Sequence, residues 1–316
     1  MSVNLDKPHL WKADVARSVD YYNTWFMEYA PDAYKQTRII TTREVTEVFS
    51  LTENLRSITV EVLREHPSTL QTLRMATAPP IARDRLIGLA AVSRNLVQSM
   101  EEAKRLPLRM STETSKQQLQ SVVKVLRKLL DTDIFQWLDD SHEPTEQELY
   151  RSATVIADRL CGAVADPLIR NEQEKRQLRA IARWLHDRGY TEGTRVNFKE
   201  MAPGSFSFRL NVDATQEGGR TVRIPVDAVV VPHRSKLGSL PLLIEAKSAG
   251  DFTNTNKRRK EEATKISQLR RTYGEEIQFI LFLCGYFDCG YLGYEAGEGI
   301  DWVWEHRIDD LDEFGL

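Results

Sequence analysis

The chain has 316 residues, a formal net charge of −3, 41% hydrophobic residues and 28% charged residues. These values fit a water-soluble protein of about two domains, and they exclude attraction of nucleic acid by the overall charge. No apolar run approaches the ~20 residues of a membrane-spanning helix. The N-terminus also lacks the basic start and apolar core of a signal peptide, so we expect a cytoplasmic protein.

Cysteine and histidine show no pattern of metal ligands. The three cysteines have no CxxC spacing, and the six histidines are scattered without an HxxxH pair or the arrangement of an HNH nuclease. Buried free thiols are the simpler interpretation of such cysteines. The sequence therefore predicts no zinc site.

Residues 8 to about 165 have a helical pattern almost throughout. Along the first helix, apolar residues recur at intervals of three and four, at Trp11, Val15, Val19, Tyr22, Phe26 and Tyr29. We expect Pro31 to end that helix and the polar segment 139–148 to form a linker. We predict an all-helical region, residues 1–165, ahead of a second domain, residues 166–316.

Two arginines lie at the start of one predicted helix in this region. Arg83 and Arg85 follow Pro80, where a basic side chain is unfavourable beside the positive end of the helix dipole unless an anion is near. A phosphate group is one such anion, and an acid such as Asp84 or one at a domain interface is another. We favour the structural role, because surface arginines commonly have no other.

The pattern changes after residue 166. Residues 171–189 predict a helix that ends at Gly189. Its buried side carries Leu178, Ile181 and Leu185. Glu174 could reach a metal site, but a glutamate in a first helical turn is already favoured by the dipole, and we prefer that role. Strand-like segments follow at 205–212 and 222–231, separated by a turn at residues 217–219.

The stretch 223–248, RIPVDAVVVPHRSKLGSLPLLIEAKS, organises the second domain. Asp227 precedes an apolar β-branched run, a nine-residue loop follows, and a second apolar run ends in Glu245-Ala246-Lys247. Two such runs bounded by turn residues predict a pair of neighbouring strands.

The register of this pair decides which side chains meet. In an antiparallel pair with Val231 opposite Pro241, Asp227 lies opposite Glu245, and directly opposed Cβ atoms are ~5 Å apart. Because side chains alternate along a strand, Glu245 and Lys247 share a face. The sequence thus predicts two carboxylates and a lysine at one end of a buried sheet.

This combination has a chemical use. Two carboxylates at that spacing can hold one or two Mg²⁺ ions, which keep much of their water and bind phosphate oxygens. The metal stabilises charge on a phosphate that is being cleaved and lowers the pKa of a bound water, and a lysine can orient that water or stabilise the transition state. Without a metal, the carboxylates would repel and one would be protonated.

A second Glu-x-Lys triplet provides an internal comparison. Glu102-Ala103-Lys104 lies in a helical pattern, with no apolar β run before it and no partner acid. We interpret it as a solvated helix face. The setting of the triplet at 245–247 therefore carries the hypothesis, since the triplet by itself is common.

A basic helix is predicted directly after the triplet at 245–247. From Lys247 to Arg271, eight basic residues and three acids leave a surplus of +5 in a chain of −3. A charge run is usually a solvated face, but beside a metal site it is well placed to neutralise phosphates, and we favour that role. The candidates for phosphate or base contact are Asn254, Asn256, Lys257, Arg258, Arg259 and Lys260.

The last part of the chain completes a sheet. The apolar run 277–284 predicts a strand buried on both faces, beside the strand that carries Glu245. The tail from Glu295, with Trp302 and Trp304, is expected to pack on the sheet edge.

Asp227 followed by Glu245-Ala246-Lys247 resembles the signature of the PD-(D/E)XK nuclease superfamily, although Pro225 stands two residues before Asp227 instead of next to it. Over a longer span, the chain resembles the XamI-type type II restriction endonucleases. The matching segments are KPHLWKADVARSVDYYNTWF, TAPPIARDRLIGLA and PVDAVV…LLIEAKSAGDFTNTNKRRKEEA. The implied fold class is α/β (α+β), a PD-(D/E)XK core whose mixed sheet is flanked by helices, behind a helical region.

The resemblance also implies an activity. It implies Mg²⁺-dependent double-strand cleavage of DNA at a short palindrome, with GTCGAC the expected target, by a homodimer that matches the two-fold site. A cognate DNA methyltransferase would protect the host. Asp227 and Glu245 would be metal ligands and Lys247 the catalytic lysine, with Glu174 a weaker candidate ligand. Arg83 and Arg85 stay weaker candidates for DNA contact, and residues 1–165 would embrace DNA or form the dimer contact.

Two other functions remain open from the residues alone. A repair or recombination nuclease that recognises DNA structure or ends would share the same catalytic residues, so only its cutting pattern would distinguish it. A catalytically silent DNA-binding protein on a nuclease-like fold would be favoured if the acids or the lysine were replaced. All three are present, which favours an enzyme.

Overall fold

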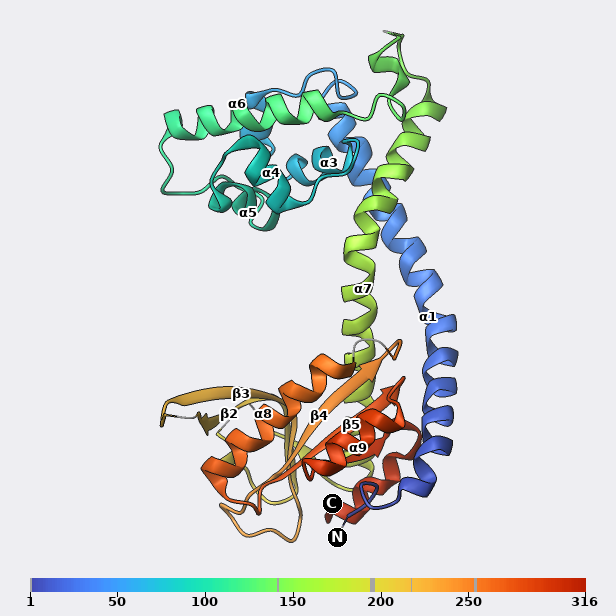
Figure 1. Ribbon diagram of the computed structural model, residues 1–316, viewed down its shortest axis with the longest axis vertical. Coiled ribbons are helices and arrows are strands. Elements are labelled where there is room, and N and C mark those ends of the chain that lie inside the picture. The colour runs from blue at the N-terminus through green and yellow to red at the C-terminus, as the bar shows by residue number, and fades with distance from the viewer. Residues whose placement is uncertain (1, 141, 194–196, 217, 253–254) are drawn as a thin grey trace. The chain divides into compact units, whose positions relative to one another are not determined.

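The computed structural model describes residues 2–140, 142–193, 197–216, 218–252 and 255–316. Its contacts divide the chain into two compact units, Met1–Ala30 with Leu168–Leu316, and Pro31–Pro167. The sequence patterns instead put the boundary near residue 165 and assigned residues 1–30 to the helical region. The chain passes from one unit to the other inside two long helices, at Pro31 of α1 (Pro8–Leu51) and at Pro167 of α7 (Glu146–Asp187). Figure 1 shows both helices.

Pro31 does not end the first helix, so that prediction was wrong. A proline inside a helix removes one backbone hydrogen bond and crowds the preceding turn, at a cost of ~3 kcal/mol. Burial of α1 on both sides of the proline offsets this cost: Tyr22 and Ala30 are buried before it, and Val45 and Phe49 after it. The prediction used only the local effect of proline on a helix, whereas the packing that stabilises α1 comes from the tertiary structure.

The unit Pro31–Pro167 is helical, as the pattern predicted. Besides parts of α1 and α7 it contains α2 (Val60–Glu65), α3 (Thr69–Met75), α4 (Arg83–Ala90), α5 (Arg94–Glu102), α6 (Thr112–Leu129) and the 3₁₀ turn η1 (Gln136–Leu138). Their apolar sides form one buried cluster. α7 begins inside the segment that was expected to be a linker, with Thr145 and Glu148 bonded to each other across its first turn.

The other unit contains a six-stranded mixed sheet. Its elements after α7 are β1 (Thr191–Glu192), η2 (Phe198–Glu200), β2 (Ser205–Thr215), β3 (Thr221–Val231), β4 (Leu242–Ala249), α8 (Thr255–Tyr273), β5 (Gln278–Gly285), α9 (Cys289–Gly297), β6 (Asp301–Trp304) and η3 (Glu305–Phe314). The strands lie in sequence order; β2, β3 and β4 are antiparallel neighbours, and β4, β5 and β6 are parallel. The predicted strand beside β4 and the edge position of Trp302 and Trp304 are thereby confirmed.

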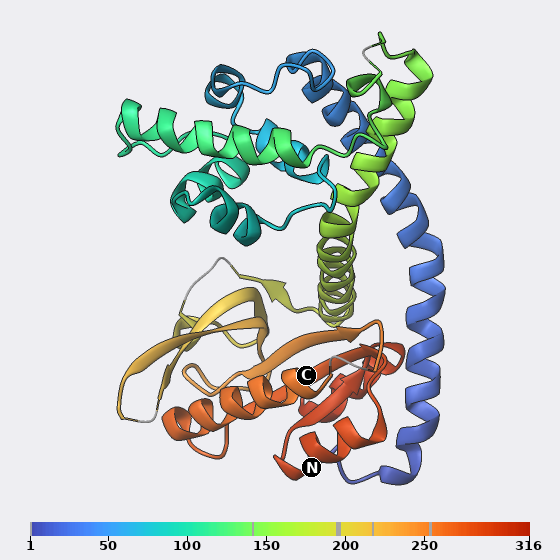
Figure 2. The ribbon, with the colours of Figure 1, turned by 45° about the horizontal axis from the view of Figure 1, so that its top comes forward.

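Helices cover both faces of this sheet (Figures 1 and 2). One buried cluster joins the sheet to α8 and α9 through residues such as Ile266 and Leu292, and a second joins the opposite face to α7 through Leu178, Ile181 and Leu185. The buried side predicted for residues 171–189 is thus confirmed, and Gly189 follows the helix with a φ of 81°. The first part of α1 also belongs to this unit, because the hydroxyl oxygen of Ser18 accepts a 2.8 Å hydrogen bond from the backbone N–H of Gly285 at the end of β5.

The register predicted for the central strand pair is the observed one. Ala228 pairs with Ile244, Val229 with Leu243 and Val230 with Leu242, which is the register that sets Asp227 against Glu245. The predicted buried thiols are found at Cys161 and Cys284, whereas Cys289 at the start of α9 is exposed. In the described part of the chain, no helix is long and apolar enough to cross a membrane.

Candidate active site

The β3 and β4 strands bring Asp227, Glu245 and Lys247 together. The ladder between these strands has its last pair at Ala228 and Ile244. One step further, the Asp227 carboxylate takes over a strand partner's role: its Oδ2 accepts a 2.8 Å hydrogen bond from the backbone N–H of Ala246. The acid is therefore fixed against the backbone between Glu245 and Lys247.

Glu245 is buried, and one of its carboxylate oxygens forms ion pairs with two lysines. The Nζ atoms of Lys247 and Lys265 lie 3.0 Å and 2.5 Å from Glu245 Oε1. The other oxygen, Oε2, is buried and has no hydrogen-bond partner among the described residues. Lys265 comes from α8, which crosses this face of the sheet.

An acid from α8, Glu262, completes the cluster. Oε1 of Glu262 lies 3.2 Å from Nζ of Lys247. Glu262 is fully buried, and neither of its oxygens has a hydrogen bond of standard geometry within the described chain. Glu262, Lys247, Glu245 and Lys265 thus form a row of alternating charges at the end of β4.

Burial and the neighbouring charges shift the pKa values in this cluster. Burial raises the pKa of Asp227 to about 6, and repulsion by Glu245 adds to the effect, while the Ala246 N–H opposes it. Burial alone would lower the pKa of Lys247, but the attraction of Glu245 and Glu262 outweighs it and raises that pKa. Burial raises the pKa of Glu262, against the opposing effect of Lys247. Lys247 therefore remains a cation.

The alternation of buried and exposed side chains in the β2–β3 hairpin shifts at Asp227. Ile224 and Val226 belong to the cluster under α8, but beyond Asp227 it is Val229 and Val231 that do so, so the alternation shifts by one residue. Opposite Asp227, the pairing skips Arg209, whose φ of 53° lies in the left-handed region. Such a conformation costs a bulky residue of order 1 kcal/mol. The distortion allows Asp227 to turn toward Ala246.

Glu174 of α7 lies near this cluster without joining it. Its Oε1 accepts a 2.8 Å hydrogen bond from Arg209 Nη2. Its charge contributes to the raised pKa of Asp227, although as a minor cause. Glu174 therefore forms an ion pair with Arg209, which the sequence analysis did not predict.

The site residues suit a Mg²⁺ ion. Among the described residues, no three acidic, histidine or cysteine side chains gather as a closed metal cage. Mg²⁺ does not need one, because it commonly binds through one or two carboxylates and keeps several waters. The raised pKa of Asp227 and the orphaned Oε2 of Glu245 both indicate a position where a cation would be favoured.

The structure describes the side chains of only some of the residues predicted to contact DNA. Asn254 lies outside the described residues, and so do the side chains of Asn256, Lys257, Arg258 and Arg259. Lys260 is exposed on α8, and Arg85 is exposed on α4.

Arg83 has acidic partners within its own unit. It lies 3.1 Å from Glu101 and 2.5 Å from Glu102. Its neighbours are therefore acids of α5 and not the Asp84 suggested by the sequence, because α4 packs beside α5. Glu102, the acid of the second Glu-x-Lys triplet, is used in this pair, as expected for a helix-surface residue.

Two residues of the cluster were missed by sequence reasoning. Glu262 and Lys265 were counted only as members of a charge run. A signal was present for Glu262, which stands four residues before Ile266 and seven before Leu269, on the buried side of the helix. A glutamate on such a side needs a partner, since burying an unpaired charge is costly.

Comparisons with known proteins identify the family. The model of the XamI restriction endonuclease family matches residues 53–304. The Type II restriction enzyme SalI of Streptomyces albus G is 56% identical over 318 residues, which cover 99% of this chain and 99% of that enzyme. The chain belongs to the XamI restriction endonuclease family. It is therefore a type II restriction endonuclease, a hydrolase of DNA phosphodiester bonds, which favours this function over the two alternatives left open by the sequence.

A solved structure adds little to this assignment. Protein VC1899 from Vibrio cholerae aligns over 90% of this chain and 55% of its own, with a TM-score of 0.29 and 14% identity. A similarity at that level carries no argument about fold or activity.

Proposed function

We propose that the protein makes Mg²⁺-dependent double-strand cuts in DNA at a short palindrome, GTCGAC. The observation that carries the proposal is the hydrogen bond from the Ala246 N–H to Asp227, which holds that carboxylate beside Glu245 and Lys247. In this proposal the sheet and its helices are a PD-(D/E)XK nuclease core. The target is the one expected for the XamI family.

Each of the three residues has its own role. Asp227 and Glu245 bind the metal, with Asp227 kept in place by the backbone and Glu245 offering its unbonded Oε2. Mg²⁺ bound there would stabilise charge on the scissile phosphate and lower the pKa of a coordinated water. Lys247, held as a cation by Glu245 and Glu262, donates hydrogen bonds to the water or to the phosphate as negative charge builds up. Glu174 is a weaker candidate for a further ligand.

The proposal includes partners. A palindrome presents the same half-site twice, and a homodimer with two-fold symmetry matches it with one active site for each strand. Residues of the helical unit would embrace the DNA or form the dimer contact. A cognate methyltransferase would protect the host's own sites.

A plasmid digest tests the proposal. A plasmid with GTCGAC sites is incubated with the protein in Mg²⁺, in EDTA, and with the variants Glu245→Ala and Glu102→Ala. Wild type is expected to give discrete bands only with Mg²⁺, and Glu245→Ala to lose about 10³-fold or more of the cleavage rate. Glu102→Ala makes the same chemical change in the other Glu-x-Lys triplet and is expected to cut like wild type.

Other outcomes point elsewhere. Fragments that map to a different sequence would reject the GTCGAC target and keep the enzyme class. A smear would indicate cutting directed by DNA structure or ends. Full activity of Glu245→Ala would reject the assigned site.

A further inference from the structure

We propose that the outer half of the β2–β3 hairpin reads base edges of the DNA beside the cutting centre, with Asn211 and Arg223 as specificity-determining residues. This inference rests on the proposed function, since it takes Asp227 as part of the cutting centre. It adds a recognition surface that the basic segment of α8 had been expected to supply.

The pairing of the hairpin puts these side chains on one face of its two strands, a few residues along the chain from Asp227. Asn211 pairs with Pro225, and Asp213 with Arg223, in the ladder whose pairing skips Arg209 and Asp227. Residues 210, 212, 214, 224 and 226 point into the cluster under α8. The alternate residues therefore share the opposite side of the hairpin, up to Asp227, where the alternation shifts by one residue.

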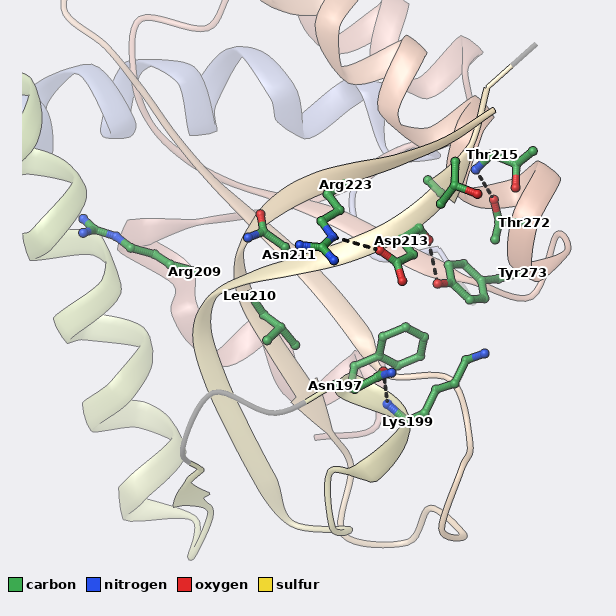
Figure 3. A pocket seen from close by; sticks show the side chains of 13 residues that line it. Asn197, Lys199, Arg209, Leu210, Asn211, Asp213, Thr215, Arg223, Thr272 and Tyr273 are labelled. Carbon is green, nitrogen blue, oxygen red and sulfur yellow. Dashed lines mark hydrogen bonds and ion pairs between the residues drawn. The ribbon is translucent and has the colours of Figure 1, made fainter. Parts of the chain in front are cut away.

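This face is polar and open. Asn211 is exposed, and the side chains of Arg223 and Asp213 are 78% and 62% exposed. The Arg223 Nε atom lies 3.6 Å from Asp213 Oδ1, a loose pair that orients the guanidinium group without using up its donors. Figure 3 shows Arg223 between Asn211 and Asp213, with Arg209 directed away toward α7.

The same residues border a pocket of about 600 Å³. Its remaining wall includes Asn197, Lys199 and Tyr273, and Lys199 lies 6.0 Å from the Tyr273 ring centroid. The backbone of the hairpin is held by α8, since Tyr273 donates a 2.6 Å hydrogen bond to the Asp213 carbonyl and Thr272 accepts one of 2.7 Å from the Thr215 N–H. Specificity requires such a rigid support for exposed side chains.

The distances suit a site of a few base pairs. A strand advances about 3.4 Å per residue, so Pro225 and its partner Asn211 lie about 7 Å from Asp227 and Arg223 about 14 Å. Base pairs in DNA are also spaced by about 3.4 Å, which makes these separations about two and four steps. Both lie inside a six-base-pair target cut near Asp227.

The chemistry of the side chains fits the major groove. That groove admits a two-stranded β-ribbon, and it presents guanine to arginine and adenine to asparagine as bidentate partners. Each such contact discriminates against the wrong base by about 1–3 kcal/mol, or about 5- to 150-fold. A lysine in place of the arginine would keep the charge but lose the paired donors.

The test compares cleavage of the mapped target with cleavage of duplexes altered at one base pair. The variants are Asn211→Ala, Arg223→Ala and Arg223→Lys, and the matched control is Arg234→Ala, an exposed arginine beyond the other end of β3. Both Arg223 variants are expected to lose about 5- to 150-fold on the target and to lose discrimination at one base pair only. Asn211→Ala is expected to do the same at a different base pair, while the control matches wild type.

The outcomes separate this inference from the proposed function. If wild type cuts GTCGAC and all hairpin variants keep its rates on every duplex, the hairpin does not read bases and the proposed function stands. An equal loss on target and altered duplexes, with discrimination kept, would also overturn the inference. If wild type cuts no defined site, the proposed function fails and the hairpin's role fails with it. Equal melting temperatures of Arg223→Lys and wild type exclude misfolding as the cause of lost discrimination.

Discussion

Glu262 of α8 lies 3.2 Å from Lys247 of β4, fully buried and with no hydrogen bond of standard geometry to either oxygen within the described residues. A carboxylate in that position costs stability, because its lost hydration is replaced only by the ion pair. Retaining it is understandable if the pair fixes the position of Lys247. Glu262 is then a positioning residue for Lys247, the proposed catalytic lysine.

Replacing Glu262 should therefore separate activity from stability. We expect Glu262→Gln to reduce kcat by about 10- to 100-fold, corresponding to about 1.4–2.8 kcal/mol, with little change in KM. Its melting temperature should stay equal or rise, since a poorly solvated charge is removed. Cleavage kinetics and thermal unfolding measure the two effects, with Glu261→Gln, the exposed neighbour, as the control. A parallel fall in kcat and melting temperature would indicate a structural role only.

Lys265 should set the Mg²⁺ requirement. Its ammonium group offsets the charge of Glu245 from 2.5 Å, in competition with a metal. Removing it in Lys265→Met should lower the Mg²⁺ concentration for half-maximal cleavage by about three- to tenfold, allowing for partial solvent screening of the pair. Arg271→Met, on the exposed side of the same helix, should leave that concentration unchanged. A higher Mg²⁺ requirement in Lys265→Met would show that Lys265 supports metal binding.

Glu148, at the start of α7, should make the stability of the helical unit depend on pH in the acid range. Glu148 Oε2 accepts hydrogen bonds from the backbone N–H and the hydroxyl group of Thr145, and these bonds lower its pKa to about 2. A lowered folded-state pKa contributes stability that is present above the ordinary value of 4.5 and is lost as pH falls toward 2.

Glu148→Gln is accordingly expected to lower the melting temperature at pH 7 and to approach wild type as the pH falls below about 4. Thermal unfolding followed by circular dichroism across this range measures the difference. Glu146→Gln, in the same helical turn, should show a smaller effect. A constant difference at every pH would exclude ionisation of Glu148 as the cause.

The N-terminal segment should stabilise the unit that contains the candidate active site. The carboxylate of Asp301, at the start of β6, accepts hydrogen bonds from the backbone N–H groups of Val3, Asn4 and Leu5, of 2.6, 3.0 and 3.1 Å. Bonds to a buried charged group are worth about 1.5–3 kcal/mol each before coupling between them is considered.

Asp301→Asn replaces one acceptor oxygen by a donor and is expected to lower the free energy of unfolding by about 2–4 kcal/mol. Chemical denaturation followed by tryptophan fluorescence is a suitable measurement, because Trp11 and Trp302 are in contact beside this segment. Asp6→Asn, an exposed acid of the same segment, is the control. Equal stability of both variants would mean that the segment is anchored by other contacts.

The amino-acid sequence by itself determined the strands around Asp227 and Glu245 and their register. Two apolar runs joined by a nine-residue loop predict an antiparallel pair with Val231 opposite Pro241, and the pairing of Ala228 with Ile244 agrees with that register. It also determined the buried side of residues 171–189, because helical periodicity is a local property. The family resemblance on the quoted segments gave the enzyme class, which the family match bears out.

Only the tertiary structure decided which distant side chains complete the cluster. Glu262 and Lys265 meet Lys247 and Glu245 because α8 crosses the sheet at one particular position, and no local pattern encodes that position. The continuation of α1 through Pro31 has the same origin, since a local cost was outweighed by packing on both sides of the proline. Periodicity fixes which side of a helix or strand is buried, whereas the residues it meets depend on how the elements pack together.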